Sequence, residues 1–60
     1  MALIIKNDKS EIEISNLDKD NEVNISVSHN LPFGEGYESI YINNLDAIEI
    51  IKHLKQQFEL

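Results

Sequence analysis

The sequence predicts an α+β domain in which a four-stranded antiparallel meander is followed by one C-terminal amphipathic helix, an order of ββββα in two layers. Up to Asn43, short segments alternate apolar and polar residues, as strands with one buried face do. Clusters of polar, turn-forming residues separate these segments. Beyond Asn43 the apolar spacing changes from about 2 to about 3.6 residues, which is the period of a helix.

The first two segments predict a hairpin. Ala2 to Lys6 carries apolar side chains on both parities, so we expect both of its faces to be covered. Turn-forming residues 7–10 follow this segment. Glu11 to Ser15 then alternates, with Ile12 and Ile14 on one side. Consecutive strands joined by a short connection usually pair side by side.

The third segment has the clearest strand pattern in the chain. A second polar turn, residues 16–21, precedes Glu22 to Ser28. Val23, Ile25 and Val27 share one parity of this segment, and polar residues occupy the other. The pattern predicts a strand with one apolar face.

A longer loop is predicted from His29 to Tyr37, because this stretch holds both glycines and the only proline. We expect Gly34 and Gly36 to adopt positive φ in the turn. The fourth predicted strand is Glu38 to Asn43. Its side chains alternate, with Ile40 and Ile42 inward and Ser39 and Tyr41 outward.

The last segment predicts a helix of about 15 residues, or about 22 Å. Asn43 is a suitable N-cap, and Asp46 places a carboxylate in the first turn. One helix covers only one sheet face, and apolar residues such as Leu45 lie off its stripe. We therefore expect a homodimer, the alternative being scattered exposed apolar residues on a monomer. The predicted stripe, about 100° wide, consists of Ala47, Ile50, Ile51, Leu54 and Phe58.

Size and composition predict a single domain, residues 1–60, with a small core. The absence of cysteine excludes disulfides and thiolate metal sites. A net charge of −6 opposes binding to nucleic acid or to an anionic membrane. We find neither a signal-peptide pattern nor the run of about 20 apolar residues that a membrane span needs, so a cytoplasmic location is expected.

We expect no enzyme activity, cofactor or metal. The chain has no Cys or Thr. Ser28 and His29 could in principle supply a nucleophile and a base, but a scaffold this small can hardly build a water-excluded pocket around them. Asp18 to Glu22 alternates oxygen-bearing residues but lacks the Gly and Glu of a calcium loop, which favours a polar turn. The segment from Gly34 to Gly36 lacks the third glycine of a dinucleotide-binding loop.

Exposed aromatic and acidic residues form the candidate interaction surface. Aromatic residues are frequent binding anchors, and acids attract basic partners. The alternatives are that Leu31 and Phe33 cap the core and that the acids are simply solvated. Acids gather in the first two turns and on the second strand, namely Asp8, Glu11, Glu13, Asp18, Asp20 and Glu22. The candidate residues are Phe33, Tyr37, Tyr41, Glu11, Glu13 and Glu22.

The segment from Glu38 to Leu54 (ESIYINNLDAIEIIKHL) resembles the strand, cap and helix that end many very small phage-encoded accessory proteins. Some of that group are anti-defence proteins, which inhibit host immune complexes by binding. The resemblance implies a soluble, often oligomeric binder that acts inside a bacterial cell. It contains no functional motif, so it assigns no site residue.

These observations together predict a small acidic phage-type accessory protein that binds and inhibits or modulates a host defence protein. One alternative is a dimeric structural or regulatory module, and another is a small-molecule-binding protein with a pocket between protomers. A salt-sensitive complex with a basic protein favours the first. Stability that depends on chain concentration favours the second, and a thermal shift with nucleotides favours the third.

Overall fold

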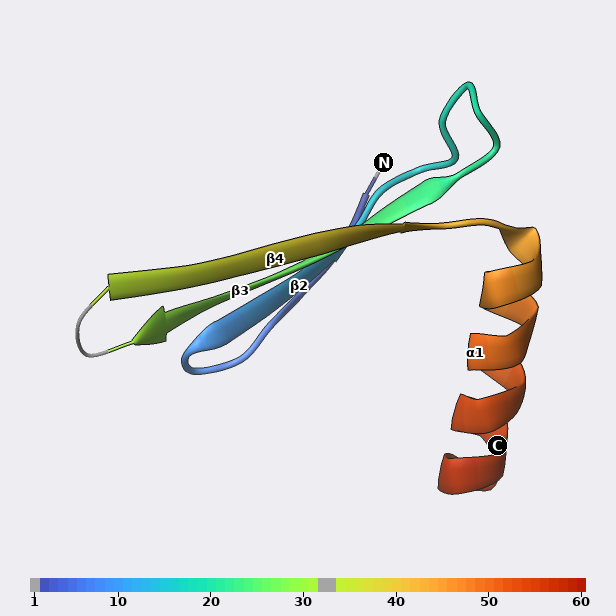
Figure 1. Cartoon of the computed structure of the whole chain (residues 1–60). Helices are drawn as coiled ribbons and strands as arrows, with labels where there is room; N and C mark the ends of the chain where they lie inside the picture. Colours follow the sequence, from blue (N-terminus) through green and yellow to red (C-terminus); the bar gives the residue numbers. More distant parts are fainter. Residues whose placement is uncertain (1, 32–33) are drawn as a thin grey trace.

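The structure, a computed structural model, describes residues 2–31 and 34–60. One antiparallel sheet has the strand order β1-β2-β3-β4, and a single helix, α1, follows it (Figure 1). This confirms the predicted ββββα arrangement. The bounds are β1 Leu3–Lys6, β2 Ser10–Ile14, β3 Val23–Leu31, β4 Gly34–Ile42 and α1 Asn44–Phe58.

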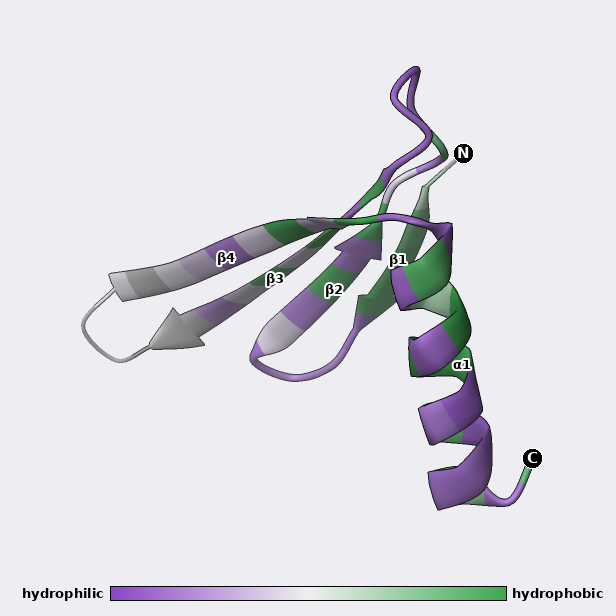
Figure 2. Ribbon diagram, turned by 45° about the vertical axis from the view of Figure 1, so that its right-hand side comes forward, coloured by the Kyte–Doolittle hydropathy of each residue, from purple (hydrophilic) through white to green (hydrophobic). Residues whose placement is uncertain are grey.

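The strand register gives the sheet two chemically different faces, because directly opposed residues of antiparallel strands lie on the same face. Figure 2 shows the alternation of apolar and polar residues along β2 and β3. We call the first face the aliphatic face; it holds Leu3, Ile5, Ile12, Ile14, Val23, Ile25, Val27, Ile40 and Ile42. We call the second the polar face; it holds Ile4, Lys6, Glu11, Glu13, Asn24, Ser26, Ser28, Tyr37, Ser39 and Tyr41.

The two predicted polar turns connect the strands as expected. The β1–β2 turn is closed by a hydrogen bond from the Asn7 amide to the Ser10 carbonyl, 3.0 Å long. In the β2–β3 loop, Asp18 Oδ1 accepts from the amides of Asp20, at 2.8 Å, and Glu22, at 3.0 Å. The Asp18 carboxylate thus organises a polar turn, which is the interpretation that its sequence context favoured over a calcium loop.

The long loop predicted from His29 to Tyr37 is not found. β3 continues to Leu31 and β4 begins at Gly34, so most of that stretch is paired strand. Gly34 has the expected positive φ, 146°. Gly36 instead lies opposite His29, where a Cβ atom would collide with the imidazole ring. Its role is to leave room for a cross-strand side chain, which allows pairing to continue.

The start of α1 follows the local prediction closely. Asn43, the N-cap, has an extended backbone, and its Oδ1 accepts from the Asp46 amide at 2.9 Å. The Asp46 carboxylate accepts in return from the Asn43 amide at 3.2 Å. This reciprocal pair is a capping box, which satisfies two amides that the helix leaves without partners. At the other end Glu59 adopts a left-handed conformation, and the Leu60 amide donates to the Lys55 carbonyl at 3.0 Å.

The helix does not lie over the sheet of its own chain, contrary to the expected two-layer packing. Figure 1 shows α1 leaving the end of β4 at a steep angle. Among the described residues β4 is the only element that α1 contacts, and no residue of α1 is buried. Ile51, which we expected in the core, is 52% exposed, and Ile42 is the only aliphatic side chain of the described part that is buried. The first strand, expected to be covered on both faces, is exposed throughout.

A single chain is correspondingly open. Its Cα radius of gyration is 13.4 Å, whereas a compact domain of this length has about 10 Å. Its accessible surface is 5406 Å², whereas a compact monomer of this mass exposes about 4,000 Å². The apolar surfaces of the sheet and the helix are both formed, but they do not cover each other within one chain.

Candidate interaction surface

The polar face is built from short rows of opposed residues across the strands. One row joins Lys6, Glu11, Ser28 and Tyr37 across all four strands. Tyr37 and Tyr41 are 66% and 62% exposed. Both belong to β4 and share the parity that faces the polar side of the sheet. Side chains on a paired strand have a fixed direction, so the two phenol rings project from a defined surface.

The structure brings four of the six predicted residues onto one face. Glu11 and Glu13 of β2 and Tyr37 and Tyr41 of β4 all belong to the polar face. Parity predicted this for Glu11, Glu13 and Tyr41, whereas Tyr37 was expected in a loop. Glu22 lies in the β2–β3 loop immediately before β3, outside the paired face. The prediction for Phe33 lies outside the described residues.

The other acids do not form one continuous patch. Asp8 lies in the β1–β2 turn, whereas Asp18 and Asp20 lie in the β2–β3 loop at the opposite end of the sheet (Figure 1). Glu11 is partly neutralised by Lys6, whose Nζ lies 3.6 Å from Glu11 Oε1. The acids that share the polar face with the two tyrosines are therefore Glu11 and Glu13 of β2.

Small polar residues, none of them among the predicted interaction residues, form the middle of this face. Ser26 is only 9% exposed, and Ser28 and Asn24 are half-buried. Asn24 also donates its side-chain amide to the Ile40 carbonyl at 3.3 Å. Short side chains on β3 leave the longer ones of β2 and β4 standing above them. The alternation of Ser and Asn on the polar parity of Glu22 to Ser28 was the signal available in the sequence.

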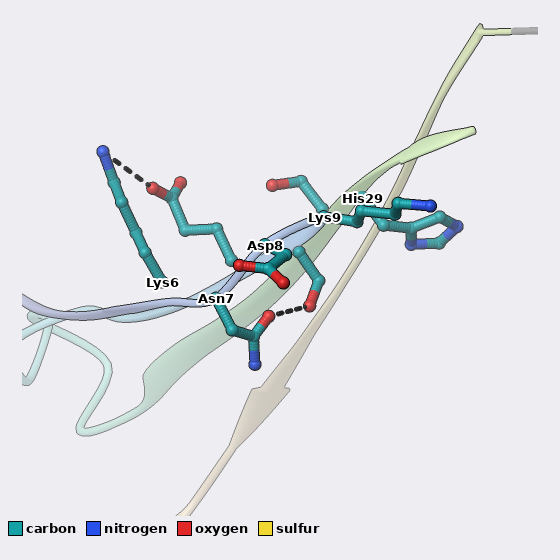
Figure 3. A pocket seen from close by; sticks show the side chains of 8 residues that line it. Lys6, Asn7, Asp8, Lys9 and His29 are labelled. Atoms are coloured by element: carbon teal, nitrogen blue, oxygen red, sulfur yellow. Dashed lines mark hydrogen bonds and ion pairs between the residues drawn. The ribbon is translucent and has the colours of Figure 1, made fainter. Parts of the chain in front are cut away.

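A shallow hollow lies beside the β1–β2 turn and has a volume of about 300 Å³. Figure 3 shows its two internal contacts, the Lys6–Glu11 ion pair and the hydrogen bond from Ser10 to Asn7. Both are ordinary surface interactions, and the charges of the lining are mixed. The lining residues are Lys6, Asn7, Asp8, Lys9, Ser10, Glu11, Ser28 and His29.

The strand pairing separates Ser28 from His29, and no metal cluster is found among the described residues. Ser28 is opposed to Glu11 and Tyr37, while His29 is opposed to Ser10 and Gly36, so the two neighbours occupy different faces. No set of three or more His, Cys, Asp or Glu residues in the described part is arranged to hold a metal ion. What the polar face offers chemically is hydrogen bonding, negative charge and aromatic contact area.

Two further results complete the description. The one helix of the described chain is too short and too polar to cross a membrane. Comparison of the chain with models of protein families, with curated proteins and with solved structures finds no match.

Proposed function

We propose that this protein acts by binding another protein through its polar face, without catalysis, and that it does so as a homodimer. The observation that carries the proposal is the alignment of Tyr37 and Tyr41 with Glu11 and Glu13 on one exposed strand face. Tyrosines on a rigid scaffold contribute large contact areas at low entropic cost, which is why they recur as binding anchors. Their placement on a paired strand supports a preformed surface.

The partner that fits this surface is a protein with a basic patch. The chain has a net charge of −6, and among the strand residues of the polar face only Lys6 is basic. Complementary charge accelerates encounter and suppresses wrong partners. The resemblance to small phage-encoded proteins favours a host protein inside the bacterial cell, such as a defence protein. We propose inhibition by occupying that protein's basic surface.

A dimeric structural or regulatory module is the second candidate. The exposure of the aliphatic face and of the apolar stripe of α1 supports it, because soluble monomers rarely leave large contiguous apolar patches in water. The two candidates share the dimer and differ in whether the polar face has a partner.

The test is a pull-down from bacterial lysate with tagged chains at low salt, followed by elution with high salt. We expect one stoichiometric basic protein to be retained by the wild type and released by salt. Tyr41→Ala and Glu13→Gln should lose it. Glu49→Gln, which removes the same charge from α1, is the matched control and should retain it.

Recovery of the tagged chain alone would leave the dimeric module as the better candidate. Equal capture by wild type, Tyr41→Ala and Glu13→Gln would contradict the polar face as the binding surface, even if a partner were found.

A further inference from the structure

We propose that the aliphatic face of each chain is covered by α1 of a second copy, so that two chains exchange their helices in a symmetric dimer. This inference rests on the dimer of the proposed function and names the element that covers the exposed face. In such a dimer the same two surfaces meet twice, once in each direction, as a two-fold axis requires.

Two apolar surfaces in each chain lack cover, one on the sheet and one on the helix. On the sheet, the row Leu3, Ile14, Ile25 and Ile40 crosses all four strands, and its outer members are 54% and 58% exposed. On α1, every residue of the predicted stripe except Ala47 is exposed. An apolar sheet face and an apolar helix stripe are the two surfaces that pack together in an ordinary two-layer α+β domain.

The dimensions of the two surfaces match. The 15 residues of α1 make a rod about 22 Å long. Four strands spaced about 4.8 Å apart make a sheet about 19 Å wide. One helix laid across the strands therefore reaches from one edge of the aliphatic face to the other.

The excess surface of the single chain is the amount that a stable dimer buries. Each chain exposes 5406 Å², which exceeds the value for a compact monomer by about 1,400 Å². Two copies that hide this excess bury about 2,800 Å², within the range of obligate homodimers.

The β4–α1 junction explains why the helix of the same chain is not the cover. Only Asn43 separates Ile42, the last residue of β4, from Asn44, the first residue of α1. The extended backbone of Asn43 and its two hydrogen bonds with Asp46 hold the helix away from the sheet. A fold-back over the aliphatic face requires this junction to bend, whereas a second copy covers the face with the junction intact. A connection too short for a fold-back favours exchange of an element between chains.

Charge and geometry favour helix exchange over other contacts between copies. Each copy carries a net charge of −6, so the favourable contact is one that brings few charges together. The stripe of α1 has no ionisable residue, and the described aliphatic face has two, Glu38 opposite Val27 and His29 at the end of the face nearest the β1–β2 turn. Direct packing of two sheets would leave both helix stripes in water, and pairing of two β4 edges would leave both apolar surfaces exposed.

Single cysteines provide a test, because the chain has none of its own. Ile12→Cys marks the middle of the aliphatic face, and Leu54→Cys marks the middle of the stripe. The two variant chains are mixed, one of them tagged, and treated with a short bis-maleimide. Light scattering gives the mass of the uncrosslinked wild type, and circular dichroism verifies that each variant is folded.

We expect a wild-type mass twice that of one chain and a crosslinked heterodimer from the mixture, with little crosslinking of either variant alone. A monomeric mass would overturn the proposal. Crosslinking of Ile12→Cys to itself would show two sheets face to face, and crosslinking within one chain of the double variant Ile12→Cys/Leu54→Cys would show a fold-back; either result also overturns it.

Adding Tyr41→Ala separates this proposal from the proposed function. The substitution lies on the polar face, so the crosslinked heterodimer should be unchanged while partner capture is lost. A dimer with the expected crosslinks but no partner would contradict only the binding role. Partner capture by a monomer would contradict the helix exchange and the dimer, but not the binding role of the polar face.

Discussion

The two faces of the sheet share the same strands and the same register, yet their exposure has different physical meanings. The polar face presents serine, asparagine, glutamate and tyrosine, which tolerate contact with water. The aliphatic face presents Leu, Ile and Val from all four strands and is almost as open. Exposure of the first face costs little free energy, whereas exposure of the second opposes folding.

This contrast supports the proposal that one chain by itself is not a complete folding unit. A domain of this size has only about 3–5 kcal/mol of stability from its own core, and here a single aliphatic side chain of the described part is buried. We therefore expect the protein to be stable only when the aliphatic face is covered. The polar face remains available for a partner because folding does not need it.

The largest expected effect comes from placing the same charge on each face in turn. Ile25→Asp places a carboxylate between Ile14 and Ile40; with the aliphatic face covered by a second copy, it should destabilise by more than about 3 kcal/mol, enough to unfold the protein. Ser39→Asp, on the polar face, should cost no more than about 1 kcal/mol, the range of strand propensity. Urea unfolding at one chain concentration measures both. Equal destabilisation would remove the distinction between the faces.

Ile51→Ala tests whether the apolar stripe of α1 is covered. In a single chain Ile51 is 52% exposed, and its truncation would matter little. Packed on a second copy, it should destabilise by about 2–5 kcal/mol as a buried cavity, with an unfolding midpoint that rises with chain concentration. Lys52→Ala, on the polar side of α1, is the matched control. If both variants unfold like the wild type, the stripe is solvent-exposed.

Tyr41→Ala tests whether the polar face serves partner binding and not folding. Tyr41 is 62% exposed, so the free energy of unfolding should change by less than about 0.5 kcal/mol. Partner binding should weaken by about 2 kcal/mol, or about thirtyfold, if the ring is an anchor. Calorimetric titration with the purified partner gives the second number. If Tyr41→Ala unfolds the protein as thoroughly as Ile51→Ala, the assignment of the faces is wrong.

Asn43→Ala tests the junction that directs α1 away from its own sheet. Loss of the side-chain acceptor for the Asp46 amide should cost about 1 kcal/mol, as N-cap substitutions generally do. Asn44→Ala, one residue into the helix, lacks this role and should cost much less. The stabilities of the two variants are compared by thermal unfolding monitored by circular dichroism. A more mobile junction should also increase intrachain crosslinking in the double-cysteine variant.

The smallest expected effect is that of the ion pair at the edge of the polar face. Lys6 Nζ and Glu11 Oε1 are 3.6 Å apart and the lysine is largely solvated. A double-mutant cycle with Lys6→Met and Glu11→Gln should give a coupling of about 0.2–1 kcal/mol. The coupling should fall as salt is added. A larger, salt-insensitive coupling would mean that this edge is buried by a partner or a second copy.

The local elements were predictable because their signals are local. Alternation placed Ile25 and Tyr41 on opposite faces, and the spacing of Asn43 and Asp46 predicted the cap that the structure contains. The loop from His29 to Tyr37 was predicted wrongly because glycine and proline indicate turns. The pairing of His29 with Gly36 depends instead on a side chain from another strand. The serines of the polar face were missed for the same reason, since their role comes from what flanks them across the sheet.

The sequence by itself determined the two periodicities, the order ββββα and the composition of each face, because these depend on neighbours along the chain. Only the tertiary structure decided that the helix stands off the sheet, because this depends on the single residue between β4 and α1 and on hydrogen bonds at that junction. Amphipathic patterns state that a surface needs cover. These patterns do not state which chain supplies the cover, because the hydrophobic effect has no preferred direction. The direction of the helix is set instead by the geometry of the β4–α1 junction.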